Sequence, residues 1–119
     1  VLFGSGDQTR TFCYIDDNID TCLLAMKNNA VINDVMNIGG ESEVKIKDLA
    51  ELIIRLTNSQ SKITFAPALK EGDMIRRCPD IKKMKNILKR DRIPLEEGIK
   101  KLLASKSFNQ LICSESNGE

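Results

Sequence analysis

The chain has 119 residues, of which 41% are hydrophobic and 29% charged, and its formal net charge is +1. This length and composition predict one small globular domain and exclude a disordered segment. The near-neutral charge provides no global field for nucleic acid or an anionic membrane, and no apolar run approaches the ~20 residues of a membrane span.

Cysteine and histidine content narrows the chemistry. The four cysteines form no Cys-x-x-Cys pair, so the sequence predicts no metal site. The residues after Val1 lack the pattern of a secretory signal, and Cys22 falls on an apolar helix face. We therefore expect reduced thiols and a cytoplasmic location rather than disulfides. The lack of histidine removes Ser-His and Cys-His nucleophile pairs, which leaves carboxylate, tyrosine or lysine for any catalysis.

A turn, a strand and a helix are predicted over the first 28 residues. Gly4-Ser5-Gly6 predicts the turn, because glycine adopts a positive φ without steric cost. It is not a dinucleotide-binding fingerprint, since the third glycine is missing and position 9 is Thr9. The β-branched and aromatic residues 11–15 predict a strand. Asp16 or Asp17 would then cap a helix over residues 16–28.

Arg10 follows this turn and is the first candidate site residue. A guanidinium offers a planar fork that matches phosphate oxygens, and Gln8 could donate an amide hydrogen to a neighbouring oxygen. The strand and helix just downstream would hold Arg10 in place. The alternative, which the spacing by itself favours, is a weak surface salt bridge between Arg10 and Asp7 or Asp16.

Four amphipathic helices are predicted in all, because apolar residues recur at helical spacing in four places. After residues 16–28 they cover residues 46–58, then 81–88 with Asp80 as the cap, then 94–103 with Pro94 at the first position. Their predicted inward residues are Ile19, Cys22, Leu23 and Met26; Leu49, Leu52, Ile53 and Leu56; Ile81, Met84 and Leu88; and Leu95, Ile99, Leu102 and Leu103.

Short extended segments are predicted between the helices. They cover residues 34–40, ending in Gly39-Gly40, residues 43–46, residues 62–66 and residues 75–78, the last because Pro79 biases Cys78 away from helix. The chain turns polar after Ser105, and residues 114–119 are predicted to fray. The fold class is therefore α/β, a small mixed domain of about four helices and short strands.

Five segments, in chain order, resemble those of the extended short-chain dehydrogenases/reductases, the NAD-dependent nucleotide-sugar epimerases, dehydratases and decarboxylases. The first is Gly-x-Gly-x-Gln-x-Arg-x-Phe-x-Tyr-x-x-Asp over residues 4–17. The others are Asn-Ile-Gly-Gly, Asp-Leu-Ala-Glu-Leu-Ile, Arg-Arg-Cys-Pro-Asp-Ile-Lys-Lys and Pro-Leu-Glu-Glu-Gly-Ile. The resemblance covers about residues 1–103 and corresponds to the final third of such an enzyme. It is greatest to UDP-glucuronate decarboxylase-like and dTDP-glucose 4,6-dehydratase-like members.

The resemblance implies a nucleotide-sugar site. Carried over by position, Arg77 would bind the nucleotide diphosphate together with Arg10 and Gln8, and Asp73 would accept from a ribose hydroxyl. Arg76 is the alternative to Arg77, because side chains alternate along an extended segment and only one of the two can face a pocket. A further alternative is that Arg76 and Arg77 are a solvated pair. Two arginines would offset the cost of desolvating a diphosphate.

Two family motifs are absent from the 119 residues, the glycine-rich NAD loop and the Tyr-x-x-x-Lys pair, since Asn18 stands four positions after Tyr14. The resemblance implies that both lie upstream of residue 1. We therefore expect no catalytic and no cofactor-binding residue here, whereas NAD would oxidise the sugar in the parent enzyme. Residues 1–106 would form the nucleotide-sugar-binding subdomain and residues 107–119 a polar tail. The face that packs on the missing Rossmann domain would be exposed, so self-association is expected.

Two other interpretations differ in class. The chain could be a stand-alone, non-catalytic interaction module that kept the family scaffold. It could also bind nucleic acid through the basic cluster of Lys82, Lys83, Lys85, Lys89, Arg90 and Arg92. The cluster lacks neighbouring aromatics for base stacking and is more typical of a solvated helix face. Two departures from the family pattern are Lys45 at a helix cap that is usually Ser or Thr, and Lys89-Arg90 where Gly and an aromatic are usual.

Overall fold

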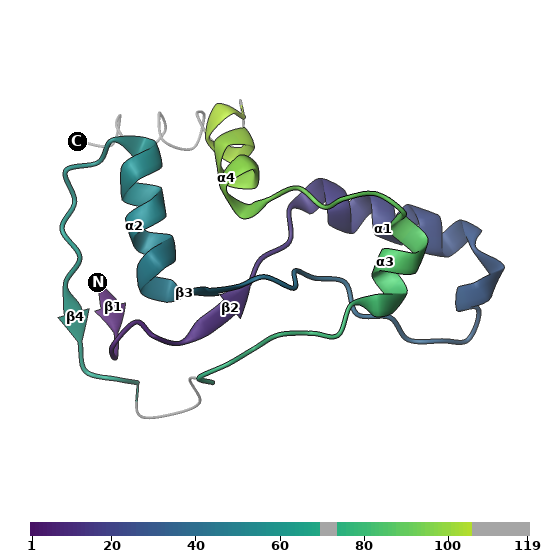
Figure 1. Cartoon of the computed structure of the whole chain (residues 1–119), viewed down its shortest axis with the longest axis horizontal. Helices are drawn as coiled ribbons and strands as arrows, with labels where there is room; N and C mark the ends of the chain where they lie inside the picture. The colour runs from purple at the N-terminus through teal and green to yellow at the C-terminus, as the bar shows by residue number, and fades with distance from the viewer. Residues whose placement is uncertain (70–73, 106–119) are drawn as a thin grey trace, which may run out of the picture.

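The structure, a computed structural model, describes residues 1–69 and 74–105. Within these ranges the chain forms four α-helices, one 3-10 helix and four short strands (Figure 1), so the mixed α/β class and the helix number are confirmed. The elements are β1 (Leu2–Phe3), β2 (Thr9–Thr11), α1 (Ile15–Lys27), η1 (Asn29–Val31), β3 (Glu43–Lys45), α2 (Ile46–Thr57), β4 (Phe65–Ala66), α3 (Lys82–Leu88) and α4 (Leu95–Ala104).

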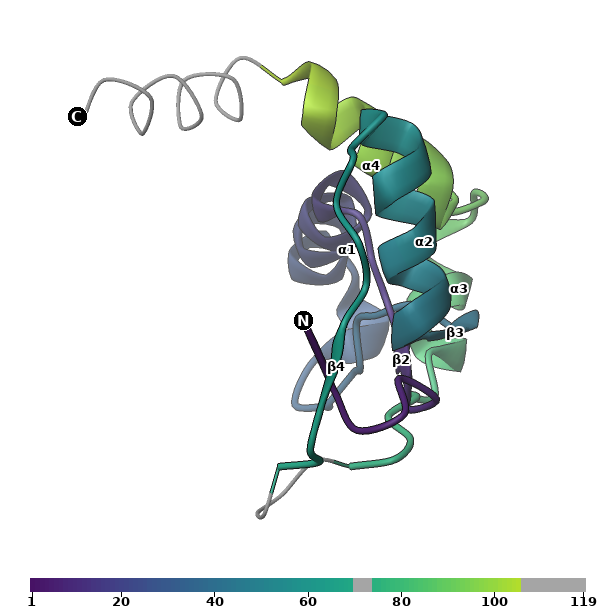
Figure 2. The ribbon, with the colours of Figure 1, turned by 90° about the vertical axis from the view of Figure 1, so that its left-hand side faces the viewer.

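The molecule is elongated, with a Cα radius of gyration of 17.4 Å against roughly 13–14 Å for a compact chain of this length. Helices α2 and α4 lie at one end with β1 and β4, and helices α1 and α3 pack together at the other (Figure 1). The shortest extent of the molecule is 24 Å, and Figure 2, turned by 90°, shows α1 on one side and α2 on the other. Extended segments join the two ends.

Two small sheets organise the described strands. Strand β1 pairs with β4 in parallel, and β2 pairs with β3 antiparallel, with Arg10 opposite Val44. An isolated parallel bridge joins Thr9 of β2 to Arg76, and the Thr9 amide donates to the Ile75 carbonyl at 2.8 Å. Strand β2 therefore lies between β3 and the segment that carries residues 75–77.

The core is small and lies where α1 and α3 pack together. Ile81, Met84 and Leu88 are the apolar side chains that are buried among the described residues, and Cys13, Met36 and Ile38 pack against them. These three residues are the inward face predicted for the helix over residues 81–88, so that prediction is confirmed. The predicted stripes of α2 and α4 are only half-buried, and Ile53 and Leu102 are exposed.

The prediction for the inward face of α1 is wrong. Ile19, Leu23 and Met26 are 47%, 50% and 85% exposed, whereas Asp17 and Thr21 are fully buried. The hydroxyl of Thr21 donates to the Asp17 carbonyl at 2.6 Å, which satisfies it inside the helix. Helix α1 thus turns a polar side toward α3 and leaves its apolar stripe outside. Periodicity finds the stripe but does not say which surface covers it.

Several predicted boundaries are also corrected. Residues 11–15 are not a strand, because the β2 ladder ends at Thr11 and α1 begins at Ile15. Tyr14 is the N-cap of α1, so neither Asp16 nor Asp17 is the cap. Residues 34–40 form no strand; Met36 and Ile38 pack on the core instead of joining a ladder. The predicted strand over 62–66 is reduced to β4, and η1 was not predicted.

Of four helix ends considered in the sequence, those at Lys45 and Lys89 agree with the structure, whereas Asp80 is not the predicted N-cap and Pro94 is not the predicted first residue. Lys45 is the N-cap of α2 and makes no side-chain cap hydrogen bond, as a residue without an acceptor must. The Asp80 carboxylate accepts from the Lys82 amide at 3.0 Å at the start of α3, although Ile81 is the N-cap. Lys89 ends α3 with a φ of 50°, a conformation that favours glycine. Pro94 is the N-cap of α4 rather than its first residue.

The buried carboxylate of Asp17 joins α1 to the loop between α3 and α4. One oxygen accepts from Nη1 of Arg90 at 2.6 Å, and the other accepts from the Ile93 amide at 2.9 Å. Nη2 of Arg90 donates to the exposed Asp20 at 2.6 Å. The guanidinium therefore bridges two carboxylates of α1, of which only one is buried. No helix of the described residues has the length and apolar character needed to cross a membrane.

We predict that Asp17→Asn lowers the free energy of unfolding by about 2–4 kcal/mol, because it weakens a charge-assisted hydrogen bond in a buried position. Asp20→Asn is the matched control: it removes the exposed partner of the same guanidinium and should cost less than ~1 kcal/mol. Urea denaturation followed by circular dichroism measures both. Equal losses for the two variants would show that burial of Asp17 does not control the contact.

Candidate functional site

A groove of about 480 Å³ lies between β2 and two extended segments, residues 37–40 and residues 77–79. We call it the arginine groove. Its lining residues are Arg10, Thr11, Cys13, Asn37, Ile38, Gly39, Gly40, Arg77, Cys78 and Pro79. These lining residues include two guanidiniums and no carboxylate, so the groove favours an anion.

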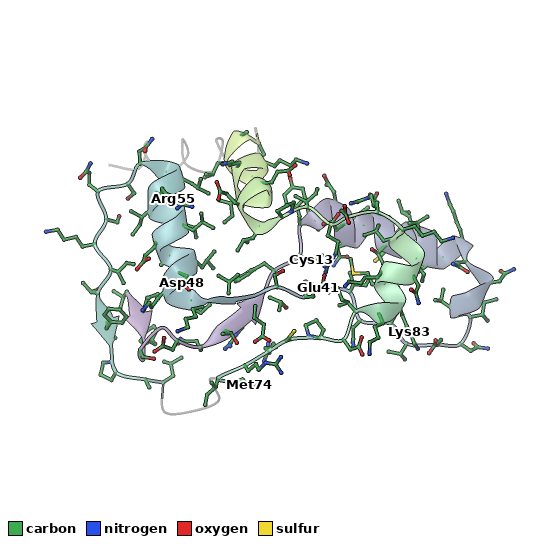
Figure 3. All side chains as sticks on the ribbon, viewed as in Figure 1. Cys13, Glu41, Asp48, Arg55, Met74 and Lys83 are labelled. Atoms are coloured by element: carbon green, nitrogen blue, oxygen red, sulfur yellow. The ribbon has the colours of Figure 1, made fainter. Side chains whose placement is uncertain are left out.

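Arg10 and Arg77 reach this groove from distant parts of the chain. Arg10 lies on β2, is half-buried, and donates from Nη1 to the carbonyl of Thr9 at 2.7 Å. Arg77 is exposed, and its Nη2 lies 3.9 Å from the sulfur of Met74. Figure 3 labels Met74 at the start of the extended segment that leads to α3. The structure thus brings together the two arginines that the sequence singled out.

Arg76 faces a different group from its neighbour. Its Nε lies 3.0 Å from both carboxylate oxygens of Glu43, and its Nη2 lies 2.6 Å from one of them. This contact lowers the pKa of the Glu43 carboxyl and raises the pKa of the Arg76 guanidinium. Because side chains alternate along an extended segment, Arg76 turns away from the groove that Arg77 lines. Of the two arginines at this position, Arg77 is therefore the one that lines the groove.

Of the other two predicted site residues, Gln8 is not among the lining residues of the groove. The side-chain amide of Gln8 donates to the carbonyl of Phe3 at 3.1 Å, on the turn rather than in the groove. Asp73 lies outside the described residues. Their roles toward a ribose or phosphate stay predictions.

The groove wall also contains Asn37 and Gly40, which the sequence analysis names only as part of the Asn-Ile-Gly-Gly segment and not as site residues. A Cβ on Gly40 would lie 2.2 Å from the carbonyl oxygen of Phe12, so only glycine permits the backbones of residues 12 and 40 to cross so closely. Asn37 donates from its side chain to the Asp80 carbonyl at 3.2 Å. The signal that could have found this wall is the Gly-Gly pair itself, since it marks a close backbone approach.

A smaller cavity of about 210 Å³ adjoins the groove and shares Cys13, Gly39 and Gly40 with it. Asp17 and Arg92 lie in its lining. Figure 3 shows Cys13 and Glu41 near the middle of the molecule, where the extended segments meet. Burial and the nearby Asp17 carboxylate raise the pKa of the Cys13 thiol, while Arg92 lowers it. The thiol at the junction of the two cavities is therefore held protonated and is a poor nucleophile.

The basic cluster around α3 is largely paired with carboxylates. Within the described part of the chain, the ion pairs of this cluster include Lys82 with Asp80, Lys83 with Asp34, Lys85 and Arg92 with Glu41, and Arg90 with Asp17 and Asp20. Lysine and arginine side chains that are engaged in this way have few donors left for a phosphate backbone. The interpretation of the cluster as a solvated, salt-bridged face is therefore favoured over a nucleic-acid surface.

Neither a catalytic pair nor a dinucleotide loop is present in the described residues. The Tyr14 ring packs against Gly98, with the Lys101 ammonium 5.7 Å from its centroid, and it does not line the arginine groove. Gly6 has a φ of 76°, and a Cβ there would lie 2.9 Å from the Cβ of Lys47, so the turn is filled by the chain itself. Strand β2, not a helix, follows it, and this arrangement does not fit NAD. No group of metal-ligating side chains occurs among the described residues.

Comparisons with known proteins agree with the family resemblance. The model of the NAD dependent epimerase/dehydratase family matches residues 1–39. UDP-glucuronic acid decarboxylase 1 of Danio rerio is 39% identical over 103 residues, which are 86% of this chain and 24% of that protein. UDP-N-acetyl-alpha-D-glucosaminuronate decarboxylase of Bacillus cytotoxicus is 32% identical over 109 residues, 87% of this chain and 34% of that protein.

Solved structures of epimerases share the fold. UDP-glucose 4-epimerase of Thermotoga maritima, determined with UDP-glucose, superposes with a TM-score of 0.78 at 28% identity over 94% of this chain and 35% of its own. UDP-glucuronic acid 4-epimerase of Bacillus cereus, in complex with UDP-glucuronic acid and NAD, gives 0.75 at 26% identity over 93% and 35%. The chain thus spans about a quarter to a third of the length of the relatives that it matches.

We predict that Cys13 is alkylated more slowly than Cys22 near pH 8. The raised pKa of Cys13 leaves less of it as the reactive thiolate at that pH, and its thiol is half-buried, whereas Cys22 is exposed on α1. Labelling with iodoacetamide followed by peptide mass spectrometry gives both rates in one sample. In concentrated urea the two rates should converge. Equal rates in the folded protein would contradict the assignment of Cys13 as an inert groove residue.

Proposed function

We propose, from the similarity of this chain to NAD-dependent nucleotide-sugar epimerases and decarboxylases, that it provides the nucleotide-sugar-binding part of such an enzyme. The ligand would be a UDP- or dTDP-type sugar. The observation that carries the proposal is that Arg10 and Arg77 both line one groove whose described lining residues include no carboxylate. The two relatives compared above act on UDP-linked sugars according to their names, and the two epimerases were solved with such ligands.

The chemistry of the groove suits a diphosphate. The ligand carries about two negative charges at neutral pH, and moving it out of water without cationic partners is unfavourable. Two guanidiniums supply planar donor forks on separate segments, so each can bind a different phosphate group. Asn37 adds a polar side chain to the wall, and the volume of about 480 Å³ lies within the range of small-molecule sites.

The proposed role is binding and positioning, not chemistry. Tyr14 packs on α4, and the Cys13 thiol is held protonated, so no described side chain of the groove is activated as a general acid, base or nucleophile. We assign residues 1–106 to this binding role. We expect a cytoplasmic location, because the described cysteines Cys13, Cys22 and Cys78 are free and reduced thiols suit that compartment.

We predict that UDP shifts the backbone amide signals of Arg10 and Arg77 in a ¹⁵N-labelled sample. Arg10→Gln and Arg77→Gln should each raise the dissociation constant for UDP about tenfold, because each removes charge-assisted hydrogen bonds to phosphate. Arg55→Gln is the control, since it removes the same charge from an exposed residue of α2 outside the groove.

Two outcomes would contradict the proposal. The first is the absence of any shift at millimolar UDP, which is the result that a stand-alone interaction module predicts. The second is an equal loss of affinity in Arg55→Gln, which would mean that UDP binding depends on the net charge of the chain rather than on the groove.

The partner of this part would be a Rossmann domain, and the outer face of α1 is where we expect it to pack. We define this face by Ile15, Ile19, Cys22, Leu23 and Met26, which are exposed and lie on one side of the helix. An apolar stripe of this length in water favours association. A domain that covers it would complete the core that the described residues lack.

We predict that the 119-residue chain self-associates through the outer face of α1. Multi-angle light scattering at rising concentration should show a mass above that of the monomer. The double variant Ile19→Gln, Leu23→Gln should return the mass to the monomer value. Leu102→Gln, at an apolar residue of α4 that is similarly exposed, should leave it unchanged. A strictly monomeric wild-type sample at high concentration would overturn this prediction.

A further inference from the structure

Glu43 makes contacts with two segments that meet beside the arginine groove. Its carboxylate accepts from Nε and Nη2 of Arg76 at 2.6 to 3.0 Å and from the hydroxyl of Thr9 at 2.8 Å. Its side chain is only 27% exposed, although that of Arg76 is 68% exposed. The two hydrogen-bond partners come from β2 and from the segment after residue 74, so one carboxylate joins both.

The backbone places these contacts one residue from each groove arginine. Thr9 precedes Arg10, and Arg76 precedes Arg77. The isolated bridge pairs Thr9 with Arg76, so the two segments run side by side in parallel. Along extended chains, alternate side chains point to opposite faces. Thr9 and Arg76 therefore meet Glu43 on one face, while Arg10 and Arg77 reach the groove on the other.

We infer that Glu43 is a positioning residue, which sets the spacing of Arg10 and Arg77 without touching the ligand. This inference rests on the proposed function, because the groove must bind a phosphate for the spacing to matter. Two guanidiniums that share a groove repel each other, and both are on side chains with high conformational freedom. A contact that fixes their two backbone segments before the ligand binds reduces the conformational entropy that is lost on binding.

The sign of one charge substitution distinguishes positioning from simple electrostatics. Glu43→Gln removes a negative charge close to a groove that binds an anion. If the carboxylate acted only through its field, its removal would tighten UDP binding. If the carboxylate holds the arginine segments in register, its removal weakens UDP binding. The two explanations therefore predict changes of opposite direction in the same dissociation constant.

The test compares Glu43→Gln with Asp7→Asn. Asp7, in the segment before β2, pairs with Lys45 of β3 at 3.0 Å, but this ion pair does not reach the segment that carries Arg77. Both variants remove one carboxylate charge from an ion pair, so both should shift the thermal midpoint little. We expect Glu43→Gln to weaken UDP binding about 3- to 10-fold and Asp7→Asn to leave it unchanged or slightly tighter.

A double-mutant cycle adds a second readout. Arg76→Gln should weaken UDP binding, and the double variant Glu43→Gln, Arg76→Gln should be no weaker than the worse single variant, because both substitutions break one contact. Tighter UDP binding by Glu43→Gln, or fully additive effects in the cycle, would overturn the inference.

Hydrogen exchange separates failure of this inference from failure of the proposed function. Without ligand, Glu43→Gln should speed exchange of the Thr9 amide, which donates to Ile75, and leave that of the Gly4 amide, which donates to Ala66, unchanged. If the wild-type chain binds no UDP, the proposed function fails, while this exchange difference still tests whether Glu43 holds the two segments. Unchanged exchange at Thr9 would reject the positioning role whatever UDP does.

Discussion

The buried carboxylate of Asp17 is the constraint on which the rest of this structure depends. It accepts from Arg90 and from the Ile93 amide, residues that lie 73 and 76 positions later in the chain. Only three apolar side chains are buried among the described residues, so apolar burial alone cannot fix how α1 meets the α3–α4 loop. A directional polar contact supplies that orientation, because a carboxylate with both oxygens engaged tolerates few alternative arrangements.

The same contact sets the position of the candidate site. Asp17 lines the smaller cavity, which shares Cys13 and Gly40 with the arginine groove. The residues between α1 and β2 are thus held at one end by the buried carboxylate and at the other by the β2–β3 ladder. Gly40 crosses this short stretch at Phe12, where no side chain would fit. The stretch of the groove wall between β2 and α1 is therefore fixed at both ends, although the apolar core is small.

What the sequence could predict was local. The helices, the inward face of α3 and the turn at Gly4 and Gly6 follow from periodicity and backbone preference, and the structure has them. The errors arose where a distant partner decides the outcome. Asp17 has the sequence pattern of a cap, yet its side chain is buried and accepts a hydrogen bond from Arg90. The apolar stripe of α1 was assigned to the core, yet the described residues provide no surface that covers it.

The candidate site shows the same limit in a sharper form. Sequence spacing could single out two adjacent arginines but could not assign their roles, because alternation leaves the choice of face open. Glu43 decides it: by pairing with Arg76, it neutralises one guanidinium and leaves Arg77 with Arg10 in the groove. Residue 43 is 33 positions away from Arg76 and lies outside the five segments that carry the family resemblance. An anion that enters the groove would thus meet the side chains of Arg10 and Arg77 and not that of Arg76, at a spacing that we infer a carboxylate outside the groove controls.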